Sequence, residues 1–377
     1  MRPVSFSRRD ALVALASAGL AAGMSGCAHL PAPPPSTKPV PPDSTTLTGD
    51  VEGYRSKLVL LGTAGGPPPT AGRRGVASAL VVGDRAYLVD AGYGTVRTLF
   101  QAGLRIADLE QVFITHMHSD HITDLFNLVW LNRSNLHLAR PLSIHGPGSA
   151  GRLPTMTKPL PLVDPDRPPP GTSDLLAGLF GAYAYEINIR TAEDSDPTDI
   201  RGFLAAHDVL PPPGAGATPD NTAPAMAPFP VFEDARVKVS AILVPHGPVF
   251  PSFAYRFDTE DGAVVFSGDT GYSSNVARIA DGADILVHEA IDLDALGRAG
   301  LDTPMLRDHM LHAHTTAQDV GRVATSAQAK RVVLTHLVPG DPRLVDDSGW
   351  ERSVRSTYSG PVVVGHDLVQ IGVGRRT

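Results

Sequence analysis

The amino-acid sequence predicts an α/β fold assembled from many short elements. From Arg55 onward, short apolar runs that are typical of strands alternate with segments of helical periodicity. The chain has 37 glycines and 35 prolines among its 377 residues, which favours turns and loops over long helices. Hydrophobic residues make up 42% of the chain and charged residues 19%, so we expect a packed core rather than a disordered chain.

The first half of the folded region is expected to consist of strands closed by turn residues, with short helices between them. The strands are expected at Lys57–Leu61, Ala79–Val82, Tyr87–Val89, Gln111–Ile114 and Leu142–Ile144. The second and third of these strands form a hairpin around Gly83 and Asp84. A helix at Thr95–Ala102 precedes the fourth strand.

Residues 151–235 are rich in proline, glycine and alanine, and we predict that they form a long insertion lying over a cleft. One helix is expected within it, at Leu175–Tyr185. Strands resume after it at Val237–Val244, Ser252–Phe257, Ala263–Phe266, Ile285–Val287 and Arg331–Thr335. Before the last strand, Thr315-x-x-Gln318 has the pattern of a capping box, and a helix with one apolar stripe follows it.

Residues 1–27 are predicted to be an export signal and not part of the fold. Arg8 and Arg9 precede the apolar run Ala11–Gly23, which is too short and too rich in Ala and Gly for a good membrane span. The arginine pair resembles a twin-arginine export signal. An ordinary secretory signal with an incidental arginine pair is the alternative interpretation.

The single cysteine lies just after this signal. Cys27 follows Met24-Ser25-Gly26, which resembles a bacterial lipoprotein cleavage box, and the alternative is an idle free thiol. Residues 28–50 are proline-rich and are expected to form an extended tether, with residues 55–377 as the folded domain. We therefore expect a bacterial protein in the periplasm, or one held at the membrane as a lipoprotein.

Cysteine content and net charge exclude or disfavour several classes of protein. One cysteine excludes an internal disulfide framework, a cysteine-based zinc finger and an iron–sulfur site. The net charge of −7 does not favour a basic face for nucleic acid.

The strongest signal is a cluster of metal-ligating residue types at the end of a predicted strand. Within six residues the chain has His116, His118, Asp120 and His121. The first two histidines are two residues apart, so an extended backbone points both rings to one side, whereas Asp120 and His121 lead into a helix expected at Ile122–Leu131. This spacing favours two adjacent metal ions. Nitrogen and oxygen ligands suit zinc first, with manganese or iron as alternatives.

The motif His116-x-His118-x-Asp120-His121 resembles the HxHxDH motif of the metallo-β-lactamase-fold hydrolase superfamily. From about Lys57 to the C-terminus, the chain is similar to the ribonuclease Z branch and its exported arylsulfatase-like and phosphodiesterase-like relatives. The other segments that carry the similarity are Leu60–Gly66, Leu88–Gly92, Pro141–Gly148, Val244–His246, Ser252–Phe257, Phe266–Thr270, Val287–Ala290 and Leu334–His336. The resemblance implies a four-layer αββα sandwich with a dinuclear metal site at one sheet edge.

The resemblance also implies the ligands of both metal ions. The expected set is His116, His118 and His246 for one ion, Asp120, His121 and His336 for the other, and Asp269 as the bridge. The residues themselves agree with this set, because His246 and His336 each follow an apolar strand and Asp269 lies in a Gly-Asp turn.

Asp120 and His314 are the residues that we expect to take part in catalysis. His314 matches the active-site histidine of the branch that is not a ligand, and it would protonate the leaving group. The neighbouring His309 and His312 are the alternatives for this assignment. Glu289 is expected to be a partner of the ligands, with His288 packed beside it, and His145 is expected to be structural.

These observations predict an exported dinuclear-metal hydrolase of small anionic esters, with phosphodiesters or aryl sulfates as substrates. A metal-bridging hydroxide would attack the ester, and two divalent ions balanced by two aspartates and one hydroxide leave a site of charge +1 that favours anions. The expected partner is a small-molecule ester and not nucleic acid, with a lipid anchor as a further link to the membrane. The oligomeric state stays open, and a homodimer is compatible with the sequence.

Three alternatives compete with this prediction. The first is a ribonuclease Z-like endonuclease acting on the 3′ end of transfer RNA precursors, and the second is a lactone or β-lactam hydrolase. The third is a non-catalytic or redox metal protein. The export signal and the net charge argue against the endonuclease, as does the interval Asp258–Val265, which is too short for the RNA-gripping arm that the ribonuclease Z branch carries there.

Overall fold

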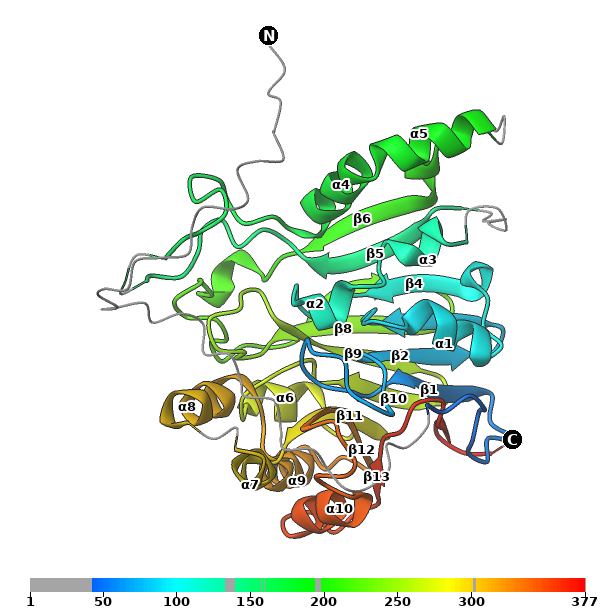
Figure 1. The fold of residues 1–377 in the computed structure, drawn as a ribbon. Helices are drawn as coiled ribbons and strands as arrows, with labels where there is room; N and C mark the ends of the chain where they lie inside the picture. Colours follow the sequence, from blue (N-terminus) through cyan, green and yellow to red (C-terminus); the bar gives the residue numbers. More distant parts are fainter. Residues whose placement is uncertain are drawn as a thin grey trace, which may run out of the picture.

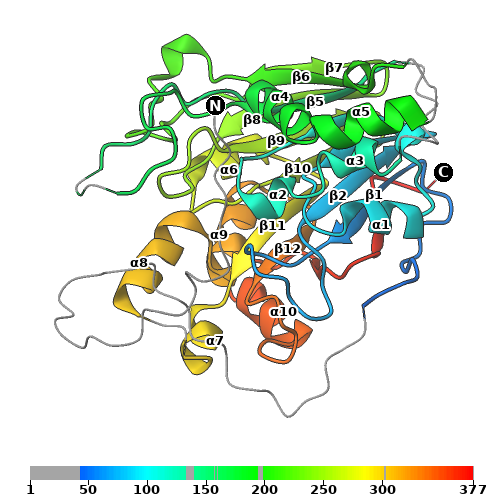
Figure 2. The same cartoon turned by 45° about the horizontal axis from the view of Figure 1, so that its top comes forward.

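The structure is a computed structural model that describes residues 43–132, 140–156, 158, 160–193, 198–300 and 303–376. Two seven-stranded sheets lie face to face, and helices cover their outer faces (Figures 1 and 2). This αββα sandwich confirms the predicted fold class. The predicted export signal and Cys27 lie outside the described residues.

The first sheet contains the N-terminal strands together with the last strand of the chain. In spatial order its strands are β14 (Gln370–Gly372), β1 (Ser56–Gly62), β2 (Ala77–Val82), β3 (Arg85–Val89), β4 (Leu109–Phe113), β5 (Leu142–Pro147) and β6 (Leu204–Val209). The helices of this half are α1 (Thr95–Gln101), α2 (Ser119–Ile122), α3 (Asn127–Trp130), α4 (Thr172–Ala182) and α5 (Ala184–Glu193).

The second sheet is formed by the C-terminal half. In spatial order its strands are β13 (Val362–Val364), β12 (Val332–Val338), β11 (Ile285–Ile291), β10 (Gly262–Phe266), β9 (Phe253–Thr259), β8 (Val237–Leu243) and β7 (Phe229–Glu233). Its helices are α6 (Ser274–Ile279), α7 (Leu293–Arg298), α8 (Pro304–Ala313), α9 (Ala317–Ser326) and α10 (Asp347–Arg355).

The core has three apolar layers, one between the sheets and one on each outer face. Tyr87 and Phe113 from the first sheet and Tyr255 and Phe257 from the second are buried between the sheets. The outer layers lie under α1 and α4 on one side and under α6, α9 and α10 on the other. β11 is buried along its whole length, and five of its seven residues are apolar, as expected of a strand covered on both faces.

Strand direction brings several strand ends to one edge of the second sheet. β10, β11 and β12 are parallel, and β8 and β10 both run antiparallel to β9. Residues that follow β8 and β10 therefore meet residues of β11 and β12 at the same edge. In the first sheet, β4 ends beside the parallel strands β3 and β5.

The predicted insertion at 151–235 contains more regular structure than expected. It contributes β6 and β7, which are the edge strands of the two sheets. It also holds two helices where we expected one, because the helix predicted at Leu175–Tyr185 begins at Thr172 and ends at Ala182, and α5 follows. β7 was missed because Pro230 disfavours a strand, although an edge strand tolerates proline.

The end of the predicted tether packs on the folded domain. The backbone of Thr48 donates to the carbonyl of Leu368 and accepts from the amide of Gln370, at 2.9 and 2.8 Å. Among the described residues, no helix has the length and apolar character needed to cross a bilayer.

Candidate metal centre

The motif residues lie where β4 leaves the first sheet. His116 and His118 follow β4 in extended backbone, and His118 is the N-cap of α2, which contains Asp120 and His121. The single helix predicted at Ile122–Leu131 is wrong, because α2 ends at Ile122 and α3 begins only at Asn127. This short first helix turns the chain so that Asp120 and His121 are buried beside the preceding histidines.

The remaining ligand candidates come from the edge of the second sheet. His246 follows β8 and Asp269 follows β10, as the sequence predicted. His336, however, lies inside β12 and not after it. It is the extra residue of a bulge between β11 and β12, and its φ of +43° turns its side chain out of the ladder. Such a conformation is rare for a residue other than glycine and is typical of functional sites.

The seven side chains form two overlapping groups. The first group is His116, His118, His246 and Asp269, and the second is Asp120, His121, Asp269 and His336. In each group, one nitrogen or oxygen atom per residue lies within 4.8 Å of the others. Asp269 belongs to both groups, so the structure brings together all seven predicted ligands in the predicted division.

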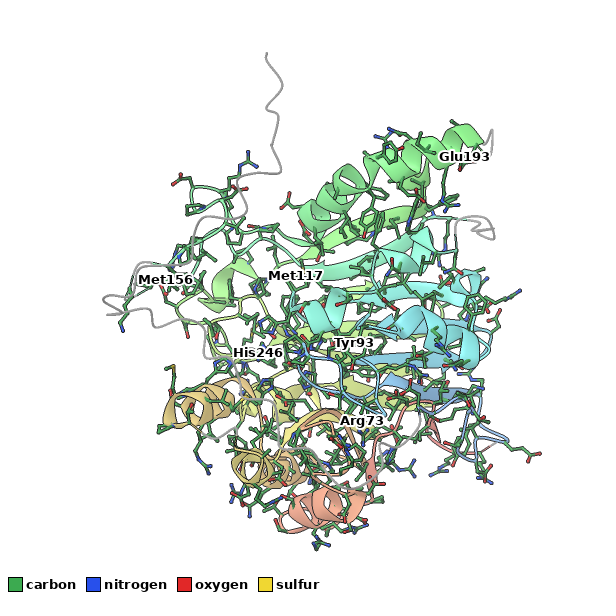
Figure 3. All side chains as sticks on the ribbon, viewed as in Figure 1. Arg73, Tyr93, Met117, Met156, Glu193 and His246 are labelled. Carbon is green, nitrogen blue, oxygen red and sulfur yellow. The ribbon has the colours of Figure 1, made fainter. Side chains whose placement is uncertain are left out.

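Individual distances place the carboxylates between the imidazoles. Asp269 Oδ2 lies 3.1 Å from His336 Nε2 and 3.8 Å from both His116 Nε2 and His246 Nε2, whereas its Oδ1 lies 3.4 Å from His121 Nε2. Asp120 Oδ2 lies 3.3 Å from His336 Nε2. His118 Nδ1 lies 3.1 Å from His246 Nε2. Figure 3 shows His246 and Met117, the neighbour of His118, in the same central region of the molecule.

The imidazole nitrogens and carboxylate oxygens of the two groups are suited to binding two cations. His116 Nε2, His121 Nε2 and Asp269 Oδ1 are buried and have no hydrogen-bond partner. Buried polar atoms rarely stay unpartnered, so these three atoms, which are divided between the two groups, indicate ion-binding positions. Six of the seven ligands are buried, and the exposed one, His118, marks the side from which a substrate can reach the centre.

Two contacts hold ligand rings in place. Asp90 Oδ2 lies 2.8 Å from His121 Nδ1, and its Oδ1 accepts the backbone N–H of Thr115 at 2.8 Å. The Ala313 carbonyl lies 2.7 Å from His246 Nδ1. Contacts of this kind leave Nε2 as the ligating nitrogen. The sequence analysis did not assign Asp90, although Leu88–Gly92 was among the segments that carried the family resemblance.

Charge and burial shift the pKa values of these groups in opposite directions. Burial lowers the pKa of His246 to about 3 and also lowers that of His116. Burial acts in the same direction on His336, but Asp269 and Asp120 outweigh it and raise the pKa to about 10. Burial opposes the ionised form of Asp120, yet the hydrogen bond from His336 and the nearby His121 lower its pKa to about 2. Without cations, the second group therefore holds protons where metal ions would bind.

His314 lies beside the two groups and belongs to neither. It is the C-cap residue of α8, and its Nδ1 lies 3.0 Å from Glu289 Oε1 and 4.0 Å from Asp269 Oδ2. Burial lowers the pKa of His314, but the Glu289 carboxylate outweighs this and raises it. His309 and His312, the alternatives, are exposed on α8.

Two further expectations concern neighbouring residues. The helix cap is shifted by one residue, because Thr316 and not Thr315 accepts the N–H of Asp319. His145 is buried in a stack with Phe113 and His207, and its Nε2–H donates to Gln111 Oε1 at 2.9 Å, which agrees with a structural role.

The sandwich and its two ligand groups define a metal-dependent hydrolase that acts on ester bonds. The chain belongs to the metallo-beta-lactamase superfamily, whose family description matches residues 71–336.

The relatives that match most of the chain are ribonuclease Z proteins. Ribonuclease Z of Mycobacterium bovis (strain BCG / Pasteur 1173P2) is 27% identical over 325 residues, which is 85% of this chain and 99% of the relative. Ribonuclease Z of Mycobacterium avium (strain 104) is 28% identical over 319 residues, covering 84% and 98%.

Solved structures share the fold at lower identity. The metallo-beta-lactamase fold protein YhfI from Bacillus subtilis has a TM-score of 0.55 at 18% identity and covers 84% of this chain and 98% of its own. Human tRNase Z, short form, has a TM-score of 0.54 at 22% identity and covers 85% and 100%.

These comparisons overturn the predicted substrate. The main prediction of a small anionic ester as the substrate, with no nucleic-acid partner, is wrong, because the matching relatives are ribonuclease Z proteins over nearly their whole length. The predicted export stays a prediction. The prediction relied on the export signal, the net charge of −7 and the short interval Asp258–Val265. Bulk charge, however, does not report a local binding surface.

Proposed function

We propose that this protein is a dinuclear-metal phosphodiesterase that cleaves RNA in the manner of ribonuclease Z, near the 3′ end of transfer RNA precursors. The observation that carries the proposal is the convergence of seven ligands and His314 in a chain that aligns with ribonuclease Z over 99% of the relative's length. Zinc is the metal that the nitrogen-rich ligand set favours.

The first metal position would be held by three histidines, and the second would have a carboxylate in place of one of them. Asp269 belongs to both groups and would be shared by the two positions. Two divalent ions bound there would lower the pKa of water toward neutrality and neutralise charge on phosphoryl oxygens. This chemistry suits a phosphodiester, which is anionic and gains charge on its oxygens during hydrolysis.

His314 would hold the proton that the leaving group needs. Its Nδ1 faces Glu289, so Nε2 is the nitrogen that can donate to the leaving oxygen. Glu289 outweighs burial, raises the pKa of His314 and so favours the protonated ring, which is the form that a general acid needs. Glu289 is itself fixed, because the same oxygen accepts the backbone N–H of Thr270 at 2.9 Å.

RNA would have to be gripped by a surface other than an arm between β9 and β10. Only Glu260 and Asp261 separate these two strands, and both hydrogen bond or ion pair with Arg55. The interval Asp258–Val265 is therefore taken up by the ends of the two strands and this tight turn. The exposed side of the centre, at His118, is the position from which the scissile phosphate would approach.

The test is cleavage of a 5′-labelled precursor tRNA carrying a 3′ extension by the metal-reconstituted protein. We expect one metal-dependent cut near the 3′ end, and no cleavage by Asp269→Ala. Asp294→Ala, which removes an exposed carboxylate on α7, is the matched control and should cleave normally. Hydrolysis of bis(p-nitrophenyl) phosphate together with an uncut precursor would contradict an RNA substrate while leaving the metal site intact.

A further inference from the structure

The loop between β1 and β2 lies directly against one of the ligand rings. A Cβ atom on Gly65 would lie 2.6 Å from His336 Nδ1 and 2.6 Å from Val338 Cγ2, so only glycine fits there. The backbone of this loop can therefore approach the imidazole more closely than any side chain would permit.

The next residue points a hydrogen-bond donor into the centre. The backbone N–H of Gly66 points at His336 Nε2, and the two nitrogen atoms lie 3.3 Å apart. The same Nε2 atom lies 3.1 Å from Asp269 Oδ2 and 3.3 Å from Asp120 Oδ2. The Gly66 N–H is thus aimed at the nitrogen that faces both carboxylates of the second ligand group.

A ligating imidazole nitrogen has one lone pair, and it cannot serve an N–H donor and a metal ion together. A proton or a metal ion on His336 Nε2 occupies that lone pair, and in either case the Gly66 N–H has no acceptor there. Leaving a partly buried donor without a partner costs free energy, so a new acceptor beside the metal position would be favoured. A phosphoryl oxygen of the substrate is an acceptor of the right charge.

The loop is held firmly enough to keep this donor in place. Gly66 has a φ of +86°, which few residues other than glycine adopt. The Gly65 N–H donates to the Leu337 carbonyl at 3.2 Å, and the Leu337 N–H donates to the Thr63 carbonyl at 3.0 Å. Arg73 Nη1 donates to Thr63 Oγ1 at 2.7 Å, and Figure 3 shows Arg73 below the central region.

We propose that the backbone N–H of Gly66 donates a hydrogen bond to a non-bridging oxygen of the scissile phosphodiester. This assignment rests on the proposed function for the class of ester, and it makes Gly66 a catalytic residue in addition to His314. A fixed donor aimed at an oxygen that gains charge stabilises the transition state more than the bound substrate.

The test deletes this one N–H by an amide-to-ester exchange, Gly66→glycolic acid, introduced with a hydroxyacylated suppressor tRNA. The matched control is Gly103→glycolic acid. Gly103 also has a positive φ, of +72°, and its N–H donates to the Phe100 carbonyl at 3.0 Å in the turn after α1, away from the ligands.

Three quantities are measured on both variants: bound metal per chain, the dissociation constant of inorganic phosphate, and kcat on precursor tRNA. For the Gly66 variant we expect unchanged metal content, about tenfold weaker phosphate binding and a ~10²-fold lower kcat. The Gly103 variant should match the wild type in all three.

Two results would overturn the inference. One is a Gly66 variant with wild-type phosphate affinity and kcat, and the other is a variant that loses metal, because the N–H would then only support His336. Failure of the proposed function is a separate result. In that case the wild type leaves precursor tRNA uncut, while phosphate binding still distinguishes the two ester variants.

Discussion

Asp90→Asn should weaken one of the two metal positions and leave the other unchanged. Asp90 offers one carboxylate oxygen to His121 Nδ1 at 2.8 Å and the other to the Thr115 N–H at 2.8 Å. Asparagine has a single acceptor oxygen, so one of these buried donors must face an NH₂ group. Loss of such an outer contact costs about 10–100-fold in metal affinity. That factor corresponds to about 1.4–2.7 kcal/mol.

The assay is a titration of the metal-free protein with zinc against a chromophoric chelator. Because His121 belongs only to the second group, we expect one equivalent of zinc to bind as in the wild type and the other to bind about 10–100-fold more weakly. The control is Asp124→Asn, since Asp124 accepts the Val96 N–H at 3.1 Å and contacts no ligand. Wild-type affinity for both equivalents, or an equal loss at both, would refute the reasoning.

Three other predictions follow from the same geometry. His314→Ala should keep both metals and slow RNA cleavage ~10²–10⁴-fold, but it should slow the hydrolysis of bis(p-nitrophenyl) phosphate only mildly, because nitrophenolate leaves without a proton. His312→Ala is the control. Equal losses of rate on both substrates would contradict the role of His314 as an acid. At pH 8, metal binding should release protons, because Asp269 and Asp120 outweigh burial and raise the pKa of His336 to about 10, and Asp269 and Asp90 likewise raise the pKa of His121 in the metal-free protein. Metal affinity should therefore fall as the pH falls, and calorimetric heats that are independent of buffer ionisation would contradict this. In cell fractionation, Cys27→Ser should release the protein from the membrane fraction, and the double variant Arg8→Lys, Arg9→Lys should block export. A wild-type protein found only in the cytoplasm would contradict the export prediction and agree with an RNA substrate.

The local parts of the centre were predictable from the sequence because their geometry is set within a few residues. His116, His118, Asp120 and His121 lie close together in the chain, and a strand followed by a helix is enough to bring them together. Most strands were predictable for a similar reason: each is a short apolar run closed by turn residues, as in the hairpin at Gly83, which has a φ of +62°.

The parts that were missed depend on contacts between distant segments. The bulge that presents His336 arises from the pairing of β11 with β12, which no local pattern reveals. Asp90 acts on a ligand 31 residues away, and Gly66 acts on one 270 residues away. The edge strands β6 and β7 escaped notice because their side chains are partly exposed and their sequences lack a continuous apolar run.

The most direct test of the proposed activity is the rate of precursor tRNA cleavage as zinc is added to the metal-free protein. Seven ligands in two groups that share Asp269 predict a rate that rises until two equivalents per chain are bound and then stays constant. A rate that saturates at one equivalent, or a precursor that stays uncut at two, would contradict a dinuclear RNA phosphodiesterase.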